Sequence, residues 1–165
     1  MIRISVPATS ANLGIGYDTL GMAVSLYSHF TFECADELTI TGCPEEFRNA
    51  NNLVYVSLVD ALAEWGEEPF GVSIDIQTEV PVARGLGSSS TCVVAGIMAA
   101  AALTGHTVTR EELVAMATRV EGHPDNVAPA ILGAAVCSFT PDGRLPRCLR
   151  YDVSDRLRFV TVIPP

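Results

Sequence analysis

Basic residues are scarce in this sequence. Ten lysines and arginines stand against 19 aspartates and glutamates, which gives a net charge of −9. Proteins that bind nucleic acid or anionic membranes by general electrostatic attraction normally carry a basic surface. We therefore expect no nucleic acid and no membrane as a partner. Any phosphate group bound by this protein must be held by local devices, such as backbone N–H groups, a helix N-terminus or a metal ion.

Cysteines are few, and no apolar run is long. The five cysteines are irregularly spaced without a CxxC pair, which argues against a disulfide scaffold and a zinc site. The longest apolar-leaning run, residues 92–103, is too short to span a bilayer. The N-terminus lacks the basic segment and long apolar stretch of a secretory signal. These observations favour a cytoplasmic protein with reduced cysteines.

Hydrophobic residues make up 48% of the 165 residues, enough to build one core. Alternating apolar residues predict strands over residues 2–6 (ended by Pro7), 20–34 (one or two strands), 38–41, 72–76, 134–139, 148–153 and 159–163. Apolar periodicity and breakers predict helices over 51–65, 90–103, 109–120 and a short one over 127–132, with a turn at 141–143. Because strands outnumber helices and come in groups, we expect an α+β fold, a two-layer α/β sandwich.

The stretch PVARGLGSSST, residues 81–91, places two glycines and four hydroxyl residues before a predicted buried helix. The first N–H groups of a helix lack internal partners and carry partial positive charge, so they can bind an anion. Hydroxyl groups there can donate to phosphate oxygens or ligate Mg²⁺. The stretch lacks the Walker A lysine, the third glycine of a dinucleotide fingerprint and the G-x-S-x-G of a hydrolase. Two interpretations of this stretch therefore stay open: a phosphate-binding loop, or a serine-rich helix start with glycines for a tight turn.

Two further loops are rich in polar residues. In EGHPDN, residues 121–126, Glu121 can join a serine of residues 88–90 as a Mg²⁺ ligand, because Mg²⁺ prefers carboxylate, hydroxyl and phosphate oxygens. An Asp/Asn turn with an incidental histidine is the alternative there. In PATSANLGIGYD, residues 7–18, Asn12 and Asp18 can present an amide and a carboxylate to a small ligand with an amino group. That loop can equally be a glycine-rich connection between strands.

In the order PATSANLGIGYD, PVARGLGSSST and EGHPDNVAPA, the three motifs resemble those of the GHMP kinase superfamily. ARGLGSSS followed by EGHPDNVAPA resembles its homoserine kinase family, over residues 1 to about 140. The resemblance implies an N-terminal domain like domain 2 of ribosomal protein S5, with a left-handed β-α-β unit. It implies transfer of the γ-phosphate of ATP to the hydroxyl of L-homoserine, giving O-phospho-L-homoserine on the route to threonine, with ATP and Mg²⁺ as cofactors.

The resemblance also assigns roles to the residues at matching motif positions. The metal ligands are Ser89 and Glu121, which are catalytic together with Asn126. The substrate-binding residues are Asn12, Asp18, His123 and Asp125. The adenine pocket is expected near residues 52–54. The ATP-binding residues are Asn52, in that stretch, and the phosphate loop: Pro81, Val82, Ala83, Arg84, Gly85, Leu86, Gly87, Ser88, Ser89, Ser90 and Thr91.

The residue type at Asn126 bears on mechanism. Some superfamily members carry an aspartate as a base in this region, and an amide cannot abstract a proton. We therefore expect a reaction without a strong side-chain base. Positioning and electrostatic stabilisation of the transferring phosphoryl group would supply most of the catalysis.

Homoserine kinases are around twice as long as this chain, and their second half contributes arginines that hold the substrate carboxylate. We therefore expect an ATP-binding domain to about residue 150 and the start of a C-terminal domain at about 155–165 with its remainder absent. Two interpretations stay open here: a fragment or N-terminal domain of a longer enzyme, which alone can lack activity, or an inactive remnant. The resemblance also allows a homodimer of the full-length protein. Two alternatives stay open: another GHMP small-molecule kinase, and a non-catalytic nucleotide-binding fragment on the same scaffold.

Overall fold

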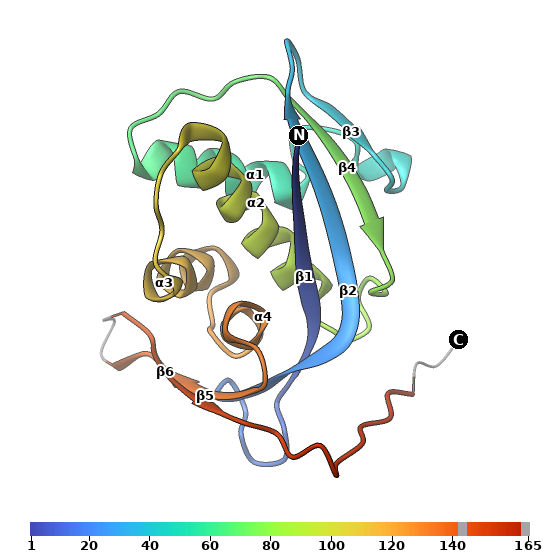
Figure 1. The fold of residues 1–165 in the computed structure, drawn as a ribbon, viewed down its shortest axis with the longest axis vertical. Helices are drawn as coiled ribbons and strands as arrows, with labels where there is room; N and C mark the ends of the chain where they lie inside the picture. The colour runs from blue at the N-terminus through green and yellow to red at the C-terminus, as the bar shows by residue number, and fades with distance from the viewer. Residues whose placement is uncertain (142–144, 163–165) are drawn as a thin grey trace.

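Six strands form one mixed sheet in the computed structural model, which describes residues 1–141 and 145–162 (Figure 1). The strands are β1 (Ile2–Ala11), β2 (Leu20–Cys34), β3 (Thr39–Thr41), β4 (Val72–Thr78), β5 (Ala135–Phe139) and β6 (Arg147–Tyr151). Their order is β3-β4-β2-β5-β6, and β1 also pairs with β2. The 15 residues of β2 form a single strand that pairs with β1, β4 and β5, so β2 ties the whole sheet together.

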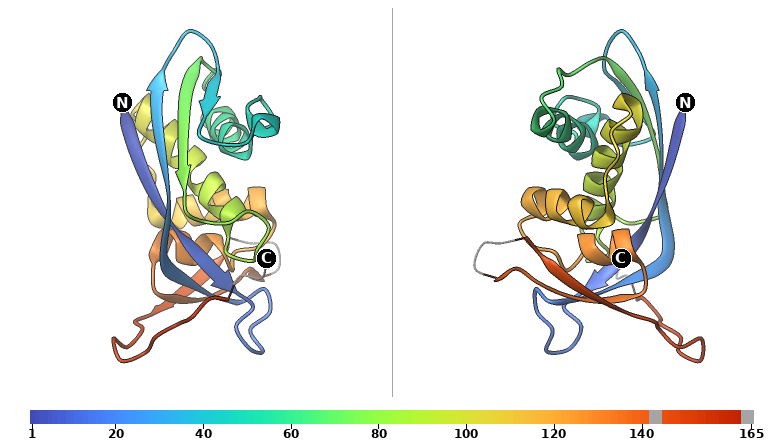
Figure 2. Two further views of the ribbon diagram at one scale, coloured as in Figure 1. Left: turned by 90° about the vertical axis from the view of Figure 1, so that its right-hand side faces the viewer. Right: turned by 60° about the vertical axis from the view of Figure 1, so that its left-hand side comes forward.

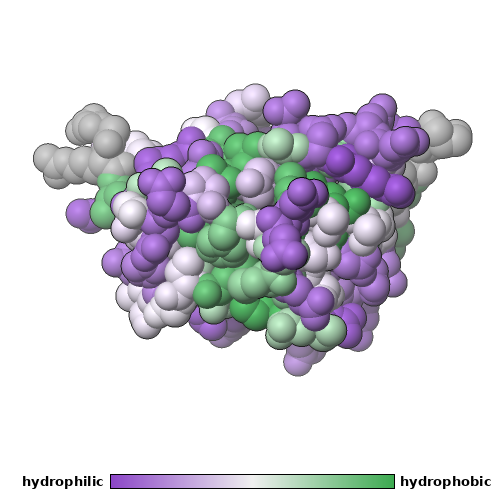
Figure 3. Space-filling model, turned by 90° about the horizontal axis from the view of Figure 1, so that it is seen from above, coloured by the Kyte–Doolittle hydropathy of each residue, from purple (hydrophilic) through white to green (hydrophobic). Residues whose placement is uncertain are grey.

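The helices lie together on one side of the sheet, as the right-hand view of Figure 2 shows. They are the 3₁₀ helix η1 (Glu45–Phe47) and the α-helices α1 (Leu53–Glu64), α2 (Ser88–Thr104), α3 (Arg110–Glu121) and α4 (Val127–Leu132). Between the two layers, the largest fully buried side chains include Phe30, Phe32, Ile74, Leu58 and Ile97. Seen from above, hydrophobic residues gather in a central band between hydrophilic ones (Figure 3). One layer of helices packed on one side of a sheet, with a buried core between the two layers, confirms the expected α+β two-layer sandwich.

Two connections between elements position the glycine-rich stretch that precedes α2. The parallel strands β3 and β4 are joined through α1 and form a β-α-β unit. The connection after β4 is the glycine-rich stretch that opens α2. Helix α2 packs very closely on α1, because a Cβ atom at Gly96 would lie 2.3 Å from the Val54 carbonyl oxygen. The start of α2 is therefore fixed by a rigid, buried helix.

The structure corrects the expected end of the first strand. We predicted that Pro7 ends it, but β1 continues to Ala11, and its pairing with β2 shifts register between Pro7 and Thr9. Proline lacks the N–H of a sheet ladder and is tolerated at edges and bulges. Both conditions hold here, since β1 pairs with β2 alone among the described strands.

Other differences concern boundaries. Helix α2 begins at Ser88, two residues before the predicted start, and β4 runs two residues further than predicted. The strand predicted over 159–163 is wrong for residues 159–162, which are neither helix nor strand, while residue 163 lies outside the described residues. The turn predicted at 141–143 lies outside them from residue 142 onward. In the described part of the chain, no helix has the length and apolar character needed to cross a membrane.

Candidate active site

The loop before α2 adopts left-handed backbone conformations at three alternate positions. Ala83, Gly85 and Gly87 have φ values of 57°, 71° and 65°. Gly87 is the N-cap of α2 and provides no side-chain cap. The first i→i−4 hydrogen bond is donated by the Thr91 N–H to the Gly87 carbonyl, at 3.0 Å. The N–H groups of residues 88–90 precede that bond, so they are available to an anion at the positive end of a 17-residue helix.

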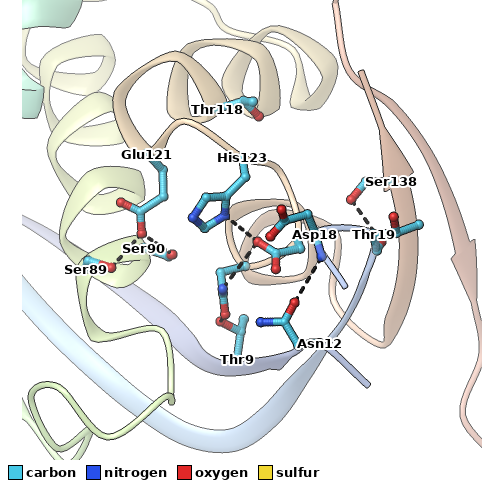
Figure 4. Close-up of polar contacts among 12 residues, drawn as sticks. Thr9, Asn12, Asp18, Thr19, Ser89, Ser90, Thr118, Glu121, His123 and Ser138 are labelled. Atoms are coloured by element: carbon cyan, nitrogen blue, oxygen red, sulfur yellow. Dashed lines mark hydrogen bonds and ion pairs between the residues drawn. The ribbon is translucent and has the colours of Figure 1, made fainter. Parts of the chain in front are cut away.

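Glu121, the last residue of α3, reaches the start of α2. Its Oε1 atom accepts hydrogen bonds from Ser89 Oγ at 2.6 Å and Ser90 Oγ at 2.8 Å (Figure 4). The chain can turn sharply after Glu121 because Gly122 ends α3 with φ 91°. Two hydroxyl oxygens and one carboxylate oxygen thus form a cluster of hard oxygen ligands.

This cluster fits Mg²⁺, which is commonly bound by one or two carboxylates together with substrate phosphates. Ser89 is exposed and Ser90 is fully buried, so Ser89 is the more accessible of the two hydroxyls. Among the described residues, no group of three or more His, Cys, Asp or Glu side chains could hold a metal ion on its own. A metal ion bound here would therefore need further oxygen ligands, such as those of a phosphate group or water.

A cavity of about 760 Å³ runs past the start of α2. Its polar wall includes Ser88, Ser89, Glu121, His123 and Asn126, and its apolar wall includes Phe30, Phe47, Leu53 and Ile76. Arg84 is the lining residue with a permanent positive charge in the part of the chain that the structure describes. A ligand with both a flat apolar group and an anionic tail matches this wall in size and chemistry.

The turn between α3 and α4 presents two further polar side chains to the cavity. His123 Nδ1 lies 2.5 Å from Asp125 Oδ1, and the Asp125 side chain is buried. Asp125 Oδ2 has no hydrogen-bond partner among the described residues. Asn126 Oδ1 accepts a hydrogen bond of 2.8 Å from Thr9 Oγ1. The buried carboxylate of Asp125 therefore holds the ring of His123, and Thr9 holds the amide of Asn126.

The loop after β1 joins the two predicted residues through the backbone of Asp18. Asn12 and Asp18 both have positive φ, 58° and 52°, and Asn12 Oδ1 accepts a 3.0 Å hydrogen bond from the Asp18 N–H. Figure 4 shows both on the side of the site that faces the α3–α4 turn. Because its oxygen closes this loop, Asn12 has its amide N–H groups left for a ligand.

Most of the predicted site residues line this one cavity. Those that line it are Asn12, Asn52, Val82 to Ser89, Thr91, Glu121, His123 and Asn126. Those not among the lining residues described are Pro81, Ser90, Asp18 and Asp125. Thr91 is buried, and its hydroxyl donates back to the Ser88 carbonyl at 2.8 Å. Asp125 is fully buried and meets the cavity through His123.

Asn52 lines the cavity, but its amide is already occupied. Its Oδ1 accepts a hydrogen bond from the Val54 N–H at 3.0 Å and so caps α1, while its Nδ2 donates to the Phe47 carbonyl at 2.8 Å. Asn52 therefore shapes the wall rather than offering free polar atoms. Leu53, in the stretch expected near the adenine pocket, lines the cavity. The sequence does not predict Phe30, Phe47 and Ile76 as its neighbours, because they come from β2, the β3–α1 connection and β4, and only long-range packing joins them.

Burial dominates the electrostatics of the thiol nearest the start of α2. It raises the pKa of Cys92 to about 11; the Thr91 hydrogen bond lowers the pKa, while the Glu121 carboxylate and Cys43 raise it further. A helix N-terminus normally lowers a thiol pKa. The Cys92 thiol is thus largely shielded from solvent and close to a negative charge.

The family model described as "GHMP kinases N terminal domain" matches residues 52–134, just over half of the chain. The chain belongs to this family. The match includes the phosphate loop and the α3–α4 turn, which together define the polar wall of the cavity.

Relatives sharpen the assignment. A Clostridium botulinum protein (strain ATCC 19397 / Type A) named homoserine kinase is 44% identical over 165 residues, which cover 99% of this chain and 55% of the relative. A Clostridium beijerinckii homoserine kinase is 45% identical with the same coverage. The solved structure of homoserine kinase from Cytophaga hutchinsonii ATCC 33406 superposes with a TM-score of 0.75 at 29% identity, covering 90% of this chain and 51% of that one. The chain spans about half the length of the curated relatives it matches.

Proposed function

We propose that this chain is the ATP-binding half of a homoserine kinase, which transfers the γ-phosphoryl group of ATP to the side-chain hydroxyl of L-homoserine. One observation carries the proposal: Glu121 meets Ser89 and Ser90 at the open start of α2, within a cavity of about 760 Å³. The homoserine kinase names of relatives that are 44–45% identical support the choice of acceptor.

In this proposal, residues to about 150 form the ATP-binding domain, and a C-terminal domain starts near residues 155–165. The remainder of that domain, in the natural protein, supplies the arginines for the substrate carboxylate, and this chain alone is inactive. The reaction takes place in the cytoplasm, which suits five free cysteines. A homodimer of the full-length protein stays a prediction.

The phosphate loop would bind the ATP phosphates through the N–H groups of residues 88–90 and the Arg84 side chain. Ser89 and Glu121 would hold Mg²⁺, which would neutralise charge on the phosphate oxygens. The flat apolar wall near Phe47 and Leu53 is where the adenine base would fit. Binding energy for ATP therefore comes from local groups, as the acidic net charge requires.

Asn12, Asp18 and His123 would bind the amino acid, and Asp125 would act by holding His123. The hydroxyl oxygen of the acceptor forms a bond to the γ-phosphorus while the bond from that phosphorus to the ADP oxygen breaks. Asn126 contributes an amide and no base, so the hydroxyl proton passes to water or to an oxygen of the transferred group. The protein lowers the barrier by positioning both substrates and by stabilising negative charge.

Steady-state kinetics of the natural full-length protein test the reaction. We expect ADP release that depends on L-homoserine, with O-phospho-L-homoserine identified by mass spectrometry. Release with mevalonate or phosphomevalonate and none with homoserine would favour another GHMP kinase. No ADP release with any of these acceptors would favour a non-catalytic nucleotide-binding protein.

Thiol protection tests the nucleotide site without any turnover. Cys43 lines the cavity, and Cys34 is exposed elsewhere, on β2, as an internal control. We expect Mg²⁺-ATP to slow alkylation of Cys43 by N-ethylmaleimide while alkylation of Cys34 stays unchanged. Equal rates with and without Mg²⁺-ATP at Cys43 would argue against a nucleotide in this cavity.

A further inference from the structure

The alternation of buried residues in β1 breaks beside the candidate active site, where the pairing of β1 with β2 is irregular. The strand alternates up to Ala8, with Ile4, Val6 and Ala8 buried, and Thr9 is then buried as well. At this point Pro7 pairs with Tyr27 and Thr9 pairs with Ala23, so the extra residues of the irregularity lie in β2. Irregular pairing of this kind beside an active site commonly re-aims a side chain. Thr9 follows the buried Ala8 directly and is itself buried where the regular ladder is interrupted.

Thr9 is fully buried, and both of its polar groups face the site. Its N–H donates to the Leu86 carbonyl of the phosphate loop at 3.1 Å, and its Oγ1 donates to Asn126 Oδ1 at 2.8 Å. A Cβ atom at Gly87 would lie 2.1 Å from Thr9 Oγ1 and 3.3 Å from Asn126 Oδ1. Thr9 thus fills the space between the phosphate loop and the α3–α4 turn (Figure 4).

The hydrogen bond to Asn126 fixes how its amide is oriented. A threonine hydroxyl has one proton, and here that proton is given to the amide oxygen. The amide nitrogen is then turned away from Thr9, with Asp125 Oδ1 at 3.4 Å from it, and Asn126 lines the cavity. An amide held in this way meets a ligand as a donor, and a donor stabilises the negative charge that develops during phosphoryl transfer.

We propose that Thr9 is a positioning residue: its hydroxyl holds Asn126 with the amide N–H groups toward the reacting oxygens. This inference rests on the proposed kinase function. Thr9 acts through Asn126 and touches neither ATP nor the acceptor. Removing its hydroxyl should therefore reduce turnover and leave ATP binding almost unchanged.

Four variants of the natural full-length protein test this: Thr9→Val, Thr9→Ser, Asn126→Ala and the double variant Thr9→Val/Asn126→Ala. Valine keeps the shape of threonine without the hydroxyl. We expect Thr9→Val to lower kcat by about tenfold, the equivalent of one or two hydrogen bonds, with KM for ATP changed by less than about twofold. Thr9→Ser should keep most of the native kcat.

The double variant separates positioning from general damage. If Thr9 acts through Asn126, Thr9→Val has no further effect in the Asn126→Ala background, whereas independent effects would multiply. Multiplying effects, native kcat in Thr9→Val, or equal losses in Thr9→Val and Thr9→Ser would each overturn the proposal. Urea unfolding of all four variants corrects for any loss of folded protein.

A spectroscopic measurement keeps this inference distinct from the proposed function. In ¹⁵N-¹H spectra, the side-chain NH₂ pair of Asn126, assigned by its loss in Asn126→Ala, should shift in Thr9→Val and stay close to native in Thr9→Ser. An unchanged pair in Thr9→Val would contradict the hydrogen bond itself. If the pair shifts as expected but no homoserine-dependent turnover is found, the positioning contact stands and the proposed reaction fails.

Discussion

Helices α2 and α3 both begin with backbone N–H groups that lack partners inside the helix, and the two helices treat those groups differently. At α3, Thr109 and Glu112 form a complete capping box, in which each side chain bonds to the other residue's backbone N–H. At α2, the N-cap is Gly87, which has no side chain to offer. One helix start is closed by its own residues, and the other is left open.

The open start costs stability and is surrounded by groups that suit a ligand. Three serines follow Gly87, and the carboxylate of Glu121 accepts hydrogen bonds from two of them. Glu121 itself is the last residue of α3, so the well-capped helix delivers the acid to the uncapped one. In the proposed kinase, α3 would therefore serve as the scaffold that positions Glu121, and the start of α2 would bind the ligand.

Removing the charge of Glu121 should have the largest effect. In Glu121→Gln, the amide oxygen can still accept both serine hydrogen bonds, so the fold is retained while a Mg²⁺ ligand charge is lost. We expect kcat of the natural protein to fall by about a hundredfold or more. Glu111→Gln, on the same helix but in its first turn, is the matched control and should keep native kcat.

The Asn126→Ala variant tests whether the reaction proceeds without a side-chain base for the acceptor hydroxyl. Because an amide is no base, we expect its loss to lower kcat by only about tenfold, far less than Glu121→Gln. Turnover should be measured at saturating Mg²⁺-ATP. Equal losses for the two variants would contradict a reaction without a side-chain base.

Glycine to alanine changes at the two ends of α2 should have the next largest effect. Gly87 and Gly105 both have positive φ, 65° and 79°, but a Cβ atom at Gly87 would lie 2.1 Å from Thr9 Oγ1, and one at Gly105 meets nothing within 4 Å. We expect Gly105→Ala to cost about 1 kcal/mol of unfolding free energy with native affinity for ATP. Gly87→Ala should weaken ATP binding by more than about tenfold, because the loop must move.

Calorimetric titration and urea unfolding of both glycine variants provide these values. Similar losses of ATP affinity in the two would mean that left-handed geometry alone, and not the close approach to Thr9, matters at Gly87.

The capped start of α3 could be predicted from the sequence, whereas the surroundings of the uncapped start of α2 could be predicted only in part. The capping box depends on Thr109 and Glu112, three residues apart, and local spacing is enough to predict it. The pairing of a loop serine with Glu121 followed from the chemistry of the residues and the resemblance. The irregular pairing of β1 with β2 depends on contacts between the two strands, and Thr9 meets a residue 117 positions away. No local pattern contains that contact, so the sequence predicts a strand end at Pro7 and gives no signal for Thr9.

Removing one hydroxyl group from the start of α2 and one from the start of α3 should separate an effect on Mg²⁺-ATP binding from an effect on the free energy of unfolding. Thr109→Ala loses a cap and should cost about 1 kcal/mol of unfolding free energy, with native affinity for Mg²⁺-ATP. Ser89→Ala removes no cap hydrogen bond and should leave the unfolding free energy within about 0.5 kcal/mol, while weakening Mg²⁺-ATP binding by about tenfold. If Thr109→Ala weakened ATP binding or Ser89→Ala destabilised the fold, the two starts would not differ in role.

The capping box also gives a pH dependence. Hydrogen bonds from the Thr109 backbone N–H, and secondly from its hydroxyl, hold the pKa of Glu112 below its usual range. A lowered folded-state pKa means that Glu112 stabilises the fold above the unfolded value of about 4.3 and that this contribution is lost as the pH falls through the folded value. The destabilisation caused by Glu112→Gln should therefore be present at pH 7 and shrink below about pH 4 in urea titrations.

The smallest effect concerns Cys92, one turn inside the open start. With its pKa raised to about 11, chiefly by burial, only about one thiol in a thousand is ionised at pH 8. Alkylation by iodoacetamide should be far slower at Cys92 than at exposed Cys34, and should quicken about tenfold per pH unit toward pH 11. Glu121 contributes to the raised pKa, so Glu121→Gln should speed alkylation of Cys92 a few-fold and leave Cys34 unchanged. An unchanged rate at Cys92 would mean that the carboxylate exerts little field at the start of α2, and its value as a metal ligand would have to be reconsidered.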